Sequence, residues 1–413
     1  MHLHSFLATP IPVLDRFAKV CLVFAIFFFP LGHAPAYVFI GLTILAWLAA
    51  GGYIERAQAL RGSAFAWAAL ILYGLFWAGL AYTNADTYYI GIELRKYAKL
   101  LFMLVAITLL QEDRWRKRAL AAFALAMLIT LILSMLSIVW HIPGLKAEVG
   151  NRVVFKDHII QNLMMAFFVL IMLVASRTAE RTSIRLACLA LAVLATVNIL
   201  GFVAGRTGYV ALFAILAVFI ACYLPARQRW FFALLALLLG LAAFQFSDTF
   251  RQRVETAFSE YRQRNTVEAT SVGARLDMIE KSIHLIQERP VMGWGTGAYP
   301  EQYCRLQPSQ EMCAIGGPHP HNQFLAFGVQ FGMVGIFAYL AFLASAVQRS
   351  RTYPVPQKVL AWGLIAALLV DSLLHAPLFL VGEALFFTLM LAVVLAPEPR
   401  SRAIPAGVPI RQS

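Results

Sequence analysis

The sequence predicts an all-α polytopic membrane protein with about 12 transmembrane helices and one large loop subdomain on the outer side. Of the 413 residues, 61% are hydrophobic and 13% are charged, whereas soluble domains are about 45–50% apolar and about 25% charged. The apolar residues form runs of about 20, the length at which a helix crosses a bilayer. The runs lack the alternation of barrel strands. This composition excludes a soluble enzyme, a disordered chain and a secreted disulfide scaffold.

Apolar runs suitable for membrane spans follow one another along the chain at 17–33, 35–52, 63–82, 96–110, 119–140, 158–176, 186–205, 208–225, 230–247, 323–347, 359–375 and 377–396. They divide the chain into nine helices in 1–247, an outer loop subdomain in 248–318, three helices in 319–396 and a tail in 397–413.

The distribution of basic residues predicts the orientation of these spans. Connections on one side of the predicted bundle hold 19 Lys and Arg, against 7 in the short connections on the other side. Basic connections remain in the cytoplasm, so we expect both termini to be cytoplasmic. The cytoplasmic segments account for the whole net charge of +13. An anionic ligand must therefore be argued from individual residues and not from the total charge.

The outer loop contains two cysteines, Cys304 and Cys313. An oxidising outer compartment favours a disulfide between them, with two free thiols as the alternative. The loop begins with an amphipathic stretch at 250–264. A second helix is expected from about 271 to 288, because apolar residues recur there at helical spacing: Leu276, Ile279, Ile283 and Ile286.

Arg275 is expected near the first turn of this second loop helix. An arginine beside a helix N-terminus makes a good anion site, and a solvated surface arginine is the alternative. The turn-rich segment Gly293-Trp294-Gly295-Thr296-Gly297 follows. A phosphate-binding loop is possible there, but without a preceding strand a plain turn is the better interpretation.

Two histidines precede the tenth expected span in Pro318-His319-Pro320-His321-Asn322. Asn322 is a good N-cap, so His321 should lie just outside a helix N-terminus. The helix dipole disfavours a protonated imidazole there, and a neutral imidazole can serve as a general base. A histidine that packs at the helix entrance is the alternative. His319 and His321 with His284 also suggest zinc, but no matching ligand set accompanies them, so we expect no metal site.

Several further charges lie close to the membrane. Arg206 joins two apolar helices with almost no loop. A charge so near hydrocarbon is costly without a partner. A lipid phosphate, Asp371 or Glu383 could be that partner, unless Arg206 reaches the interface by snorkelling. Asp371 and His375, four residues apart, either pair structurally or line a polar cavity.

A basic cluster of Arg95, Lys96 and Lys99 lies at the outer start of the fourth expected span. Basic residues are otherwise rare in the short connections on that side, so topology alone does not account for the cluster. It could bind the anionic head group of a membrane lipid.

The simplest chemistry for these residues is transfer from a lipid-linked phosphate or pyrophosphate donor. Arginine side chains would hold the leaving pyrophosphate through bidentate hydrogen bonds and replace a divalent metal in stabilising it. His321 would deprotonate an acceptor hydroxyl. We expect no cofactor and no nucleic-acid partner.

The sequence resembles the O-antigen ligase family of Gram-negative inner membranes, which is related to O-antigen polymerases and protein O-oligosaccharyltransferases. The resemblance covers most of the chain. Its sharpest motif is His-Asn, nine residues and Gly-x-x-Gly, found as His321-Asn322 followed by Gly332 and Gly335. Arg206 matches an arginine at the outer junction of two helices. Arg275 matches an arginine of the loop helix, ahead of the segment containing Pro290, Gly293 and Gly295.

The resemblance implies a membrane glycosyltransferase (GT-C-like) fold and a metal-independent, inverting transfer on the periplasmic side. The implied donor is an undecaprenyl-pyrophosphate-linked glycan, and in ligases the acceptor is a sugar hydroxyl of lipid A–core. Arg206 and Arg275 would hold pyrophosphate, and His321 would be the base. Further candidates for substrate binding are Arg95, Lys96, Lys99, Arg152, His319, Asn322, Asp371 and His375; Arg152 lies in a segment that matches the family's third outer loop only loosely.

Within this family, the single dominant outer loop favours a ligase over a polymerase. The short C-terminal tail disfavours a protein O-oligosaccharyltransferase. The rival from another class is a flippase for lipid-linked glycans, or another transporter, which would show internal repeats and charges deep in mid-span. A non-enzymatic membrane scaffold would require neither His321 nor Arg206 at its position.

Overall fold

The computed structural model describes residues 7–148, 151–228, 255, 271–307, 313 and 317–396. Within these residues the regular structure is helical, and 8 helices are long and apolar enough to cross a membrane. They are His33–Ala50 (α3), Ala64–Ala81 (α5, Ala64–Ala78, with the 3₁₀ turn η1, Gly79–Ala81), Asp113–Val139 (α8), His158–Thr178 (α9), Thr182–Phe202 (α10, Thr182–Val197, with the π-turn η2, Asn198–Phe202), Arg206–Tyr223 (α11), Gln323–Ser350 (α17) and Val355–Leu374 (α18). The expected span 230–247 and the amphipathic stretch 250–264 lie outside the described residues.

The remaining helices are shorter or more polar. They are α2 (Pro12–Leu31), α4 (Tyr53–Arg61), α6 (Thr87–Tyr97), α7 (Lys99–Leu109), α14 (Ser271–Glu288), α15 (Tyr299–Arg305) and α19 (Val381–Leu395). The loop helix expected at 271–288 is confirmed as α14. The expected fourth span, 96–110, is instead divided at Ala98 between α6 and α7. The basic cluster lies at this joint, where Lys99 Nζ donates a hydrogen bond to the Lys96 carbonyl oxygen over 3.0 Å.

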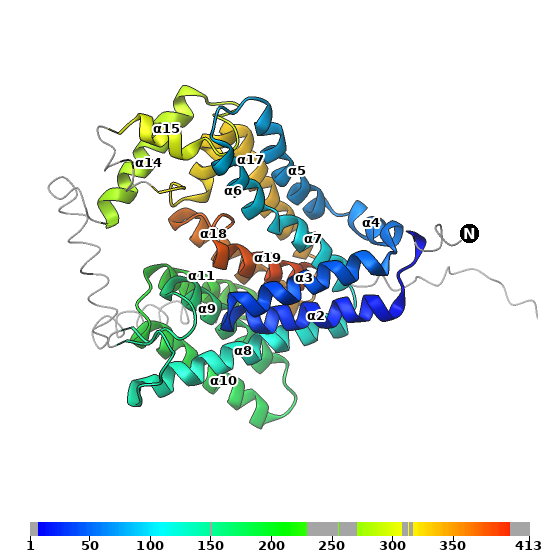
Figure 1. Cartoon of the computed structure of the whole chain (residues 1–413). Coiled ribbons are helices and arrows are strands. Elements are labelled where there is room, and N and C mark those ends of the chain that lie inside the picture. Colours follow the sequence, from blue (N-terminus) through cyan, green and yellow to red (C-terminus); the bar gives the residue numbers. More distant parts are fainter. Residues whose placement is uncertain are drawn as a thin grey trace, which may run out of the picture.

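The helices form two groups with α18 and α19 between them (Figure 1). One group contains α5, α6, α7 and α17, with α14 and α15 beside them; the other contains α8 to α11, with α2 and α3 packed alongside. α19 is only 15 residues long, but 14 of them are buried. A helix that is apolar on all sides is one surrounded by protein, so α19 belongs to the centre of the bundle.

Contacts between helix ends define one end of the bundle, here called the histidine end. α17 begins there, because Asn322 Nδ2 donates to the Leu373 carbonyl oxygen at the end of α18, over 3.1 Å. α9 and α19 also begin there, since Gly382 packs against Ile160. In Figure 1 the yellow helices α14 and α15 lie at this same end.

The opposite end is defined by two arginines. Arg349 donates to the Leu395 carbonyl oxygen at the end of α19, over 2.7 Å, and to Ser63 Oγ before α5, over 2.8 Å. Arg116 near the start of α8 donates to the Ala396 carbonyl oxygen over 3.0 Å. These bonds hold the starts of α5 and α8 beside the ends of α17 and α19.

The outer loop is anchored in a break of α17. Gly332 has φ 61° and ψ −150° in the middle of this helix, a conformation almost restricted to glycine. The break frees backbone groups of α17, and the loop forms hydrogen bonds with them. The Met333 amide donates to the Pro290 carbonyl oxygen over 2.7 Å. In the other direction, the Trp294 amide donates to the Val329 carbonyl oxygen over 2.9 Å, and the Gly295 amide donates to the Gln330 carbonyl oxygen over 2.8 Å. Gly332 thus receives the outer loop.

The Gly293–Gly297 segment is the turn that the sequence predicts, and its glycines are sterically required. All three have positive φ, between 67° and 91°. A Cβ atom on Gly293 would lie 2.6 Å from the amide nitrogens of Phe331 and Gly332. The turn therefore fits against the broken α17, and it places α14 over the start of that helix.

Candidate functional site

His321 has a strained backbone at the histidine end. Its φ is 49°, and it is the sole non-glycine residue with positive φ in the described part of the chain. Such strain persists only where surrounding contacts impose it, and it is frequent at functional sites. One such contact is a hydrogen bond that the His321 amide donates to His319 Nδ1 over 3.2 Å. His319 is buried, and its ring also packs on Phe379 at 4.9 Å between centroids.

The helix after His321 begins as the sequence predicts. Asn322 Oδ1 accepts from the Leu325 amide over 3.0 Å, which confirms Asn322 as the N-cap of α17. Gln323 then fastens this start to two neighbours: its Nε2 donates to the Tyr97 hydroxyl over 2.8 Å, and its Oε1 accepts from the Leu378 amide over 2.9 Å. The backbone that carries His321 is thus held by α6 and by the α18–α19 connection.

Both histidines are kept neutral by their surroundings. Burial, followed by the charges of Arg275 and His375, lowers the pKa of His321 to about 4. Burial is also the main reason that the pKa of His319 lies well below its ordinary value. The neutral state expected from the helix dipole is therefore supported, but desolvation is the larger cause. His321 Nδ1 is buried and has no hydrogen-bond partner among the described residues.

Arg275 of α14 lies close enough to the histidines for its charge to act on both His319 and His321. Arg275 and His321 are more than 40 residues apart in the sequence. The contacts of Pro290 and the glycine turn with α17 bring them together. The structure thus joins two of the three residues expected to be catalytic.

His375 and Asp371 form a buried pair beside this site. His375 Nδ1 lies 2.9 Å from Asp371 Oδ1, and the His375 ring is 6.0 Å from that of His321 between centroids. With Nδ1 donating to the carboxylate, the other ring nitrogen, Nε2, is an acceptor. Nε2 is buried and has no hydrogen-bond partner in the described residues.

The three residues of the basic cluster differ in position. Lys96 Nζ lies 3.5 Å from the centroid of the Phe379 ring, on which His319 also packs, so Lys96 joins the histidine site. Lys99 is half-buried at the α6–α7 joint, and Arg95 is exposed. Lys96 is therefore the residue of this cluster that the structure places closest to the histidines.

Arg206 and Arg152 belong to a neighbouring junction at the same end. Arg206 is the first residue of α11. The Arg152 amide donates to the Phe202 carbonyl oxygen over 2.8 Å, and the Ala204 amide donates to Asn151 Oδ1 over 3.2 Å. These bonds join the two arginine-containing segments. The junction adjoins the start of α9, because a Cβ on Gly205 would lie 3.0 Å from the His158 carbonyl oxygen.

Lys156 is a further candidate, which the sequence pattern alone does not indicate. Its side chain is 3% exposed, and its Nζ has no hydrogen-bond partner among the described residues. Burial, followed by the charge of Lys146, lowers the pKa of Lys156 to about 8. The Phe29 ring centroid lies 5.0 Å from this Nζ, but a buried ammonium without a hydrogen-bond partner is still costly, so the position suits an anion. The sequence feature that could indicate Lys156 is its position in a short outer connection, where basic residues are rare.

The loop subdomain is stabilised independently of the histidines. Asp277 Oδ1 pairs with Lys281 at 2.6 Å, and Asp277 Oδ2 accepts from Tyr303 and Gln307 over 2.5 and 2.8 Å. Cys304 and Cys313 are joined by a disulfide. The Asp277 contacts tie α14, which carries Arg275, to α15 and the residues just after it.

The described residues contain no group of three or more His, Cys, Asp and Glu side chains arranged to hold a metal ion. His284, weighed above as a zinc ligand, pairs with Glu288 at 3.1 Å. Positive charge at the site comes from arginine and lysine, which suits an anionic ligand.

The fold and this site define a multi-pass helical membrane protein with a polar site at one end of its bundle. Residues 190–340 match the family model described as O-antigen ligase, which supports the O-antigen ligase family. The matched region contains Arg206, Arg275 and His321. An uncharacterized protein of Haemophilus influenzae is 28% identical over 151 residues, which cover 34% of this chain and 38% of that protein. The chain thus spans less than two-fifths of the length of this relative.

Proposed function

We propose that this protein transfers a glycan from an undecaprenyl-pyrophosphate carrier to a sugar hydroxyl of lipid A–core, as an O-antigen ligase in lipopolysaccharide assembly. The single observation that carries the proposal is the placement of His321. Its backbone is strained, and its neutral imidazole has a buried nitrogen with no hydrogen-bond partner among the described residues and lies beside the cation Arg275 of the loop subdomain. The match of residues 190–340 to the O-antigen ligase family supports the same reaction class.

In the proposed step, His321 removes the proton of the acceptor hydroxyl. The acceptor oxygen attacks the anomeric carbon of the donor and forms the new glycosidic bond. The bond from that carbon to the phosphate oxygen breaks, and the pyrophosphate leaves with the electron pair. Attack opposite the leaving group inverts the configuration at the anomeric carbon.

The basic residues of the histidine end would bind the pyrophosphate. Arginine is always charged and can bind phosphate oxygens in a bidentate manner, which suits Arg275 and Arg206. The N-termini of α9, α11 and α17 add partial positive charge at the same end. Lys96 and the buried Lys156 are further candidates for phosphate contacts. We propose that these groups supply the charge that a metal provides in other transferases.

Donor binding would also strengthen the base. The pKa of His321 is about 4 while the site holds only its own cations. A bound pyrophosphate adds negative charge near the imidazole and opposes the effect of Arg275. Nearby negative charge raises the pKa of a histidine, so His321 becomes a better proton acceptor once the donor is in place.

The proposed orientation places the histidine end in the periplasm of a bacterial inner membrane and both termini in the cytoplasm. The opposite end carries Arg116 and Arg349, as well as the ion pairs of Asp15 with Lys19 at 2.7 Å and with Arg56 at 2.8 Å. An excess of basic residues on this side fits the positive-inside rule.

The experiment that tests the function is reconstitution of the purified protein with a lipid-linked glycan. Lipid A–core and a second lipid-linked repeat unit are offered together as competing acceptors, and the products are separated by mass. Glycan attached to lipid A–core is the expected result. Elongation of the lipid-linked repeat would identify a polymerase, and loss of donor from one leaflet without any covalent product would identify a flippase; either result overturns the ligase proposal.

A further inference from the structure

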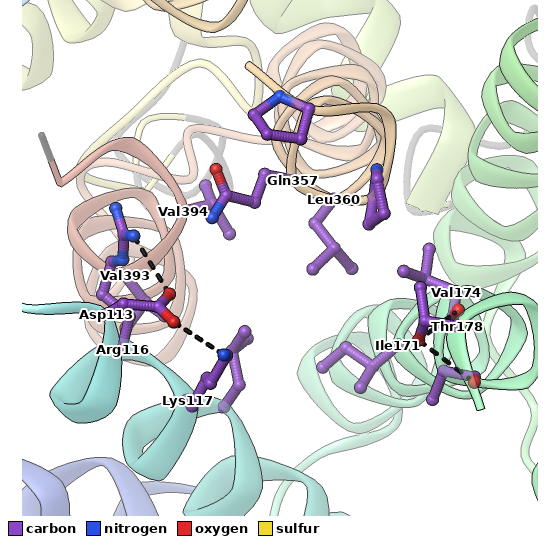
Figure 2. A pocket seen from close by; sticks show the side chains of 14 residues that line it. Asp113, Arg116, Lys117, Ile171, Val174, Thr178, Gln357, Leu360, Val393 and Val394 are labelled. Carbon is purple, nitrogen blue, oxygen red and sulfur yellow. Dashed lines mark hydrogen bonds and ion pairs between the residues drawn. The ribbon is translucent and has the colours of Figure 1, made fainter. Parts of the chain in front are cut away.

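A cavity of about 570 Å³ lies at the end of the bundle opposite the histidines (Figure 2). Its walls come from the starts of α8 and α18 and the ends of α9 and α19. Most lining side chains are apolar, among them Leu120, Ile171, Val174, Leu360 and Val393. Ligand pockets are commonly 300–1,000 Å³ and mostly apolar, with a few polar groups. This cavity is far along the bundle from His321 and takes no part in the proposed transfer.

The polar side of the cavity is formed by the first turns of α8. Figure 2 shows Asp113, Arg116 and Lys117 together on one wall, with Ile171, Val174 and Thr178 on the opposite wall. Asp113 pairs with Lys117 at 2.6 Å and with Arg116 at 3.1 Å. These two cations and one carboxylate leave the wall positively charged.

The two cations have different roles. The Arg116 side chain is 6% exposed and also donates to the Ala396 carbonyl oxygen, so it stabilises the end of α19. The Lys117 side chain is 76% exposed, so the cavity reaches the surface beside an accessible ammonium. An anion can approach Lys117 without a large desolvation cost.

Gln357 at the start of α18 supplies a second polar feature. Its Oε1 is buried and has no hydrogen-bond partner among the described residues, and the Gln357 side chain borders the cavity in Figure 2. A buried acceptor without a donor is unfavourable. A head-group hydroxyl in the cavity can hydrogen-bond the Gln357 amide.

We propose that this cavity binds an anionic glycerophospholipid of the adjacent leaflet. The acyl chain fills the apolar walls, the phosphate lies at Lys117, and a head-group hydroxyl hydrogen-bonds the Gln357 amide. Basic pockets between transmembrane helices on the cytoplasmic side bind anionic lipid head groups in other membrane proteins. The orientation proposed above places the cavity on that side. Phosphatidylglycerol has the required phosphate charge, hydroxyls and acyl chains.

The test uses the full chain in nanodiscs of phosphatidylcholine that contain a small fraction of phosphatidylglycerol with a diazirine in its acyl chain. After illumination, labelled peptides are mapped by mass spectrometry. Label is expected in the segments that line the cavity, at 113–120, 171–178, 354–360 and 393–394. Unlabelled phosphatidylglycerol should compete better than phosphatidylcholine, whereas soluble glycerol 3-phosphate should not compete, because it lacks an acyl chain.

Three variants connect the label to the cavity. Lys117→Gln should weaken competition by phosphatidylglycerol about fivefold, the effect of one basic residue near a membrane surface. Ala175→Phe should remove the label, because the larger side chain occupies the cavity. If Ala175→Phe does not fold, Lys117→Gln still tests the proposal. Arg118→Gln is the matched control, because Arg118 is also on α8 but packs over Trp115 at 4.7 Å and does not line the cavity.

The proposal is overturned by any of three results. These are equal competition by phosphatidylglycerol and phosphatidylcholine, an equal effect of Lys117→Gln and Arg118→Gln, or a label spread evenly over the membrane helices. Competition by glycerol 3-phosphate at the concentration of the lipid would also overturn it and indicate a soluble phosphate ligand.

Discussion

The amide of Met333 donates to the carbonyl oxygen of Pro290 over 2.7 Å, which joins the middle of a membrane helix to the outer loop. A regular α17 would bond this amide to a carbonyl within the helix. The break at Gly332 makes it available instead. Because Pro290 lies two residues after the end of α14, this bond sets the position of the helix that carries Arg275 relative to His321.

Gly332→Ala should therefore disrupt both the loop and the activity. A Cβ at this position would lie 2.6 Å from the Pro290 carbonyl oxygen, in a backbone conformation that alanine rarely adopts. We expect a loss of about 1–3 kcal/mol in unfolding free energy, measured by thermal unfolding in detergent, together with loss of transfer. Gly41→Ala is the matched control, because nothing lies within 4 Å of a Cβ on that helical glycine. Equal unfolding temperatures for Gly332→Ala and wild type would contradict the anchoring role.

Arg275→Gln should change both donor use and the pH dependence of transfer. Losing a charge-assisted contact with pyrophosphate should lower kcat/KM roughly 10- to 100-fold at neutral pH. In the wild type, activity requires neutral His321, so kcat/KM should fall as the pH decreases through about 4. Since the charge of Arg275 lowers this pKa, Arg275→Gln should shift the fall of kcat/KM at low pH, the acidic limb of the pH profile, to higher pH.

The donor-bound complex provides an internal check on this assignment. The acidic limb of kcat reports the complex, whereas that of kcat/KM reports the free enzyme. We expect the kcat limb at higher pH, because bound pyrophosphate raises the pKa of His321. Arg185→Gln, an exposed substitution on α10, should leave both limbs unchanged. Identical limbs for Arg275→Gln and wild type would show that Arg275 does not act on the base.

His319 should act as a positioning residue for His321. His319→Ala removes the acceptor of the His321 amide, so His321 should lose its strained conformation in part. We expect kcat to fall about fivefold or more, as for the loss of one hydrogen bond of roughly 1 kcal/mol, while donor KM changes little. His319→Asn keeps a side-chain acceptor and should recover part of the rate. A purely packing role for His319 would give equal rates for the Ala and Asn variants.

Chelation should leave transfer intact. We expect Arg275, Arg206 and the lysines of the site to neutralise the leaving pyrophosphate. The rate after extensive EDTA treatment and desalting should match the rate before it, measured with the same lipid-linked donor. Loss of activity that returns on addition of Mg²⁺ would show that these side chains do not supply the required charge.

Local sequence patterns were sufficient for the elements that depend on local chemistry. The apolar spacing from Leu276 to Ile286 predicts α14, and the side chain of Asn322 predicts the start of α17; both are confirmed. The disulfide between Cys304 and Cys313 lies within one loop, where the compartment and the short separation favour it. These features need no knowledge of distant contacts.

Features created by distant contacts could not be predicted in the same way. The break at Gly332 depends on a loop that precedes it by about 40 residues and supplies partners for the freed backbone groups. The buried Lys156 and the proximity of His375 to His321 arise from packing of separate helices. The division between α6 and α7 at Ala98 could not be predicted from hydrophobicity either, because the apolar residues of α7 make 96–110 look like one continuous span.

The central claim is that His321 is the base of a glycan transfer, and single-turnover transfer by His321→Gln tests it most directly. The variant protein is loaded with lipid-linked donor and then mixed with lipid A–core. Its rate of product formation is compared with those of wild type and of His284→Gln, which changes a histidine on the loop helix and serves as the control. We expect His321→Gln to bind donor and remain folded but to transfer at least about 100-fold more slowly, the usual contribution of a general base. His284→Gln should transfer at the wild-type rate. Transfer by His321→Gln at the wild-type rate would contradict the account.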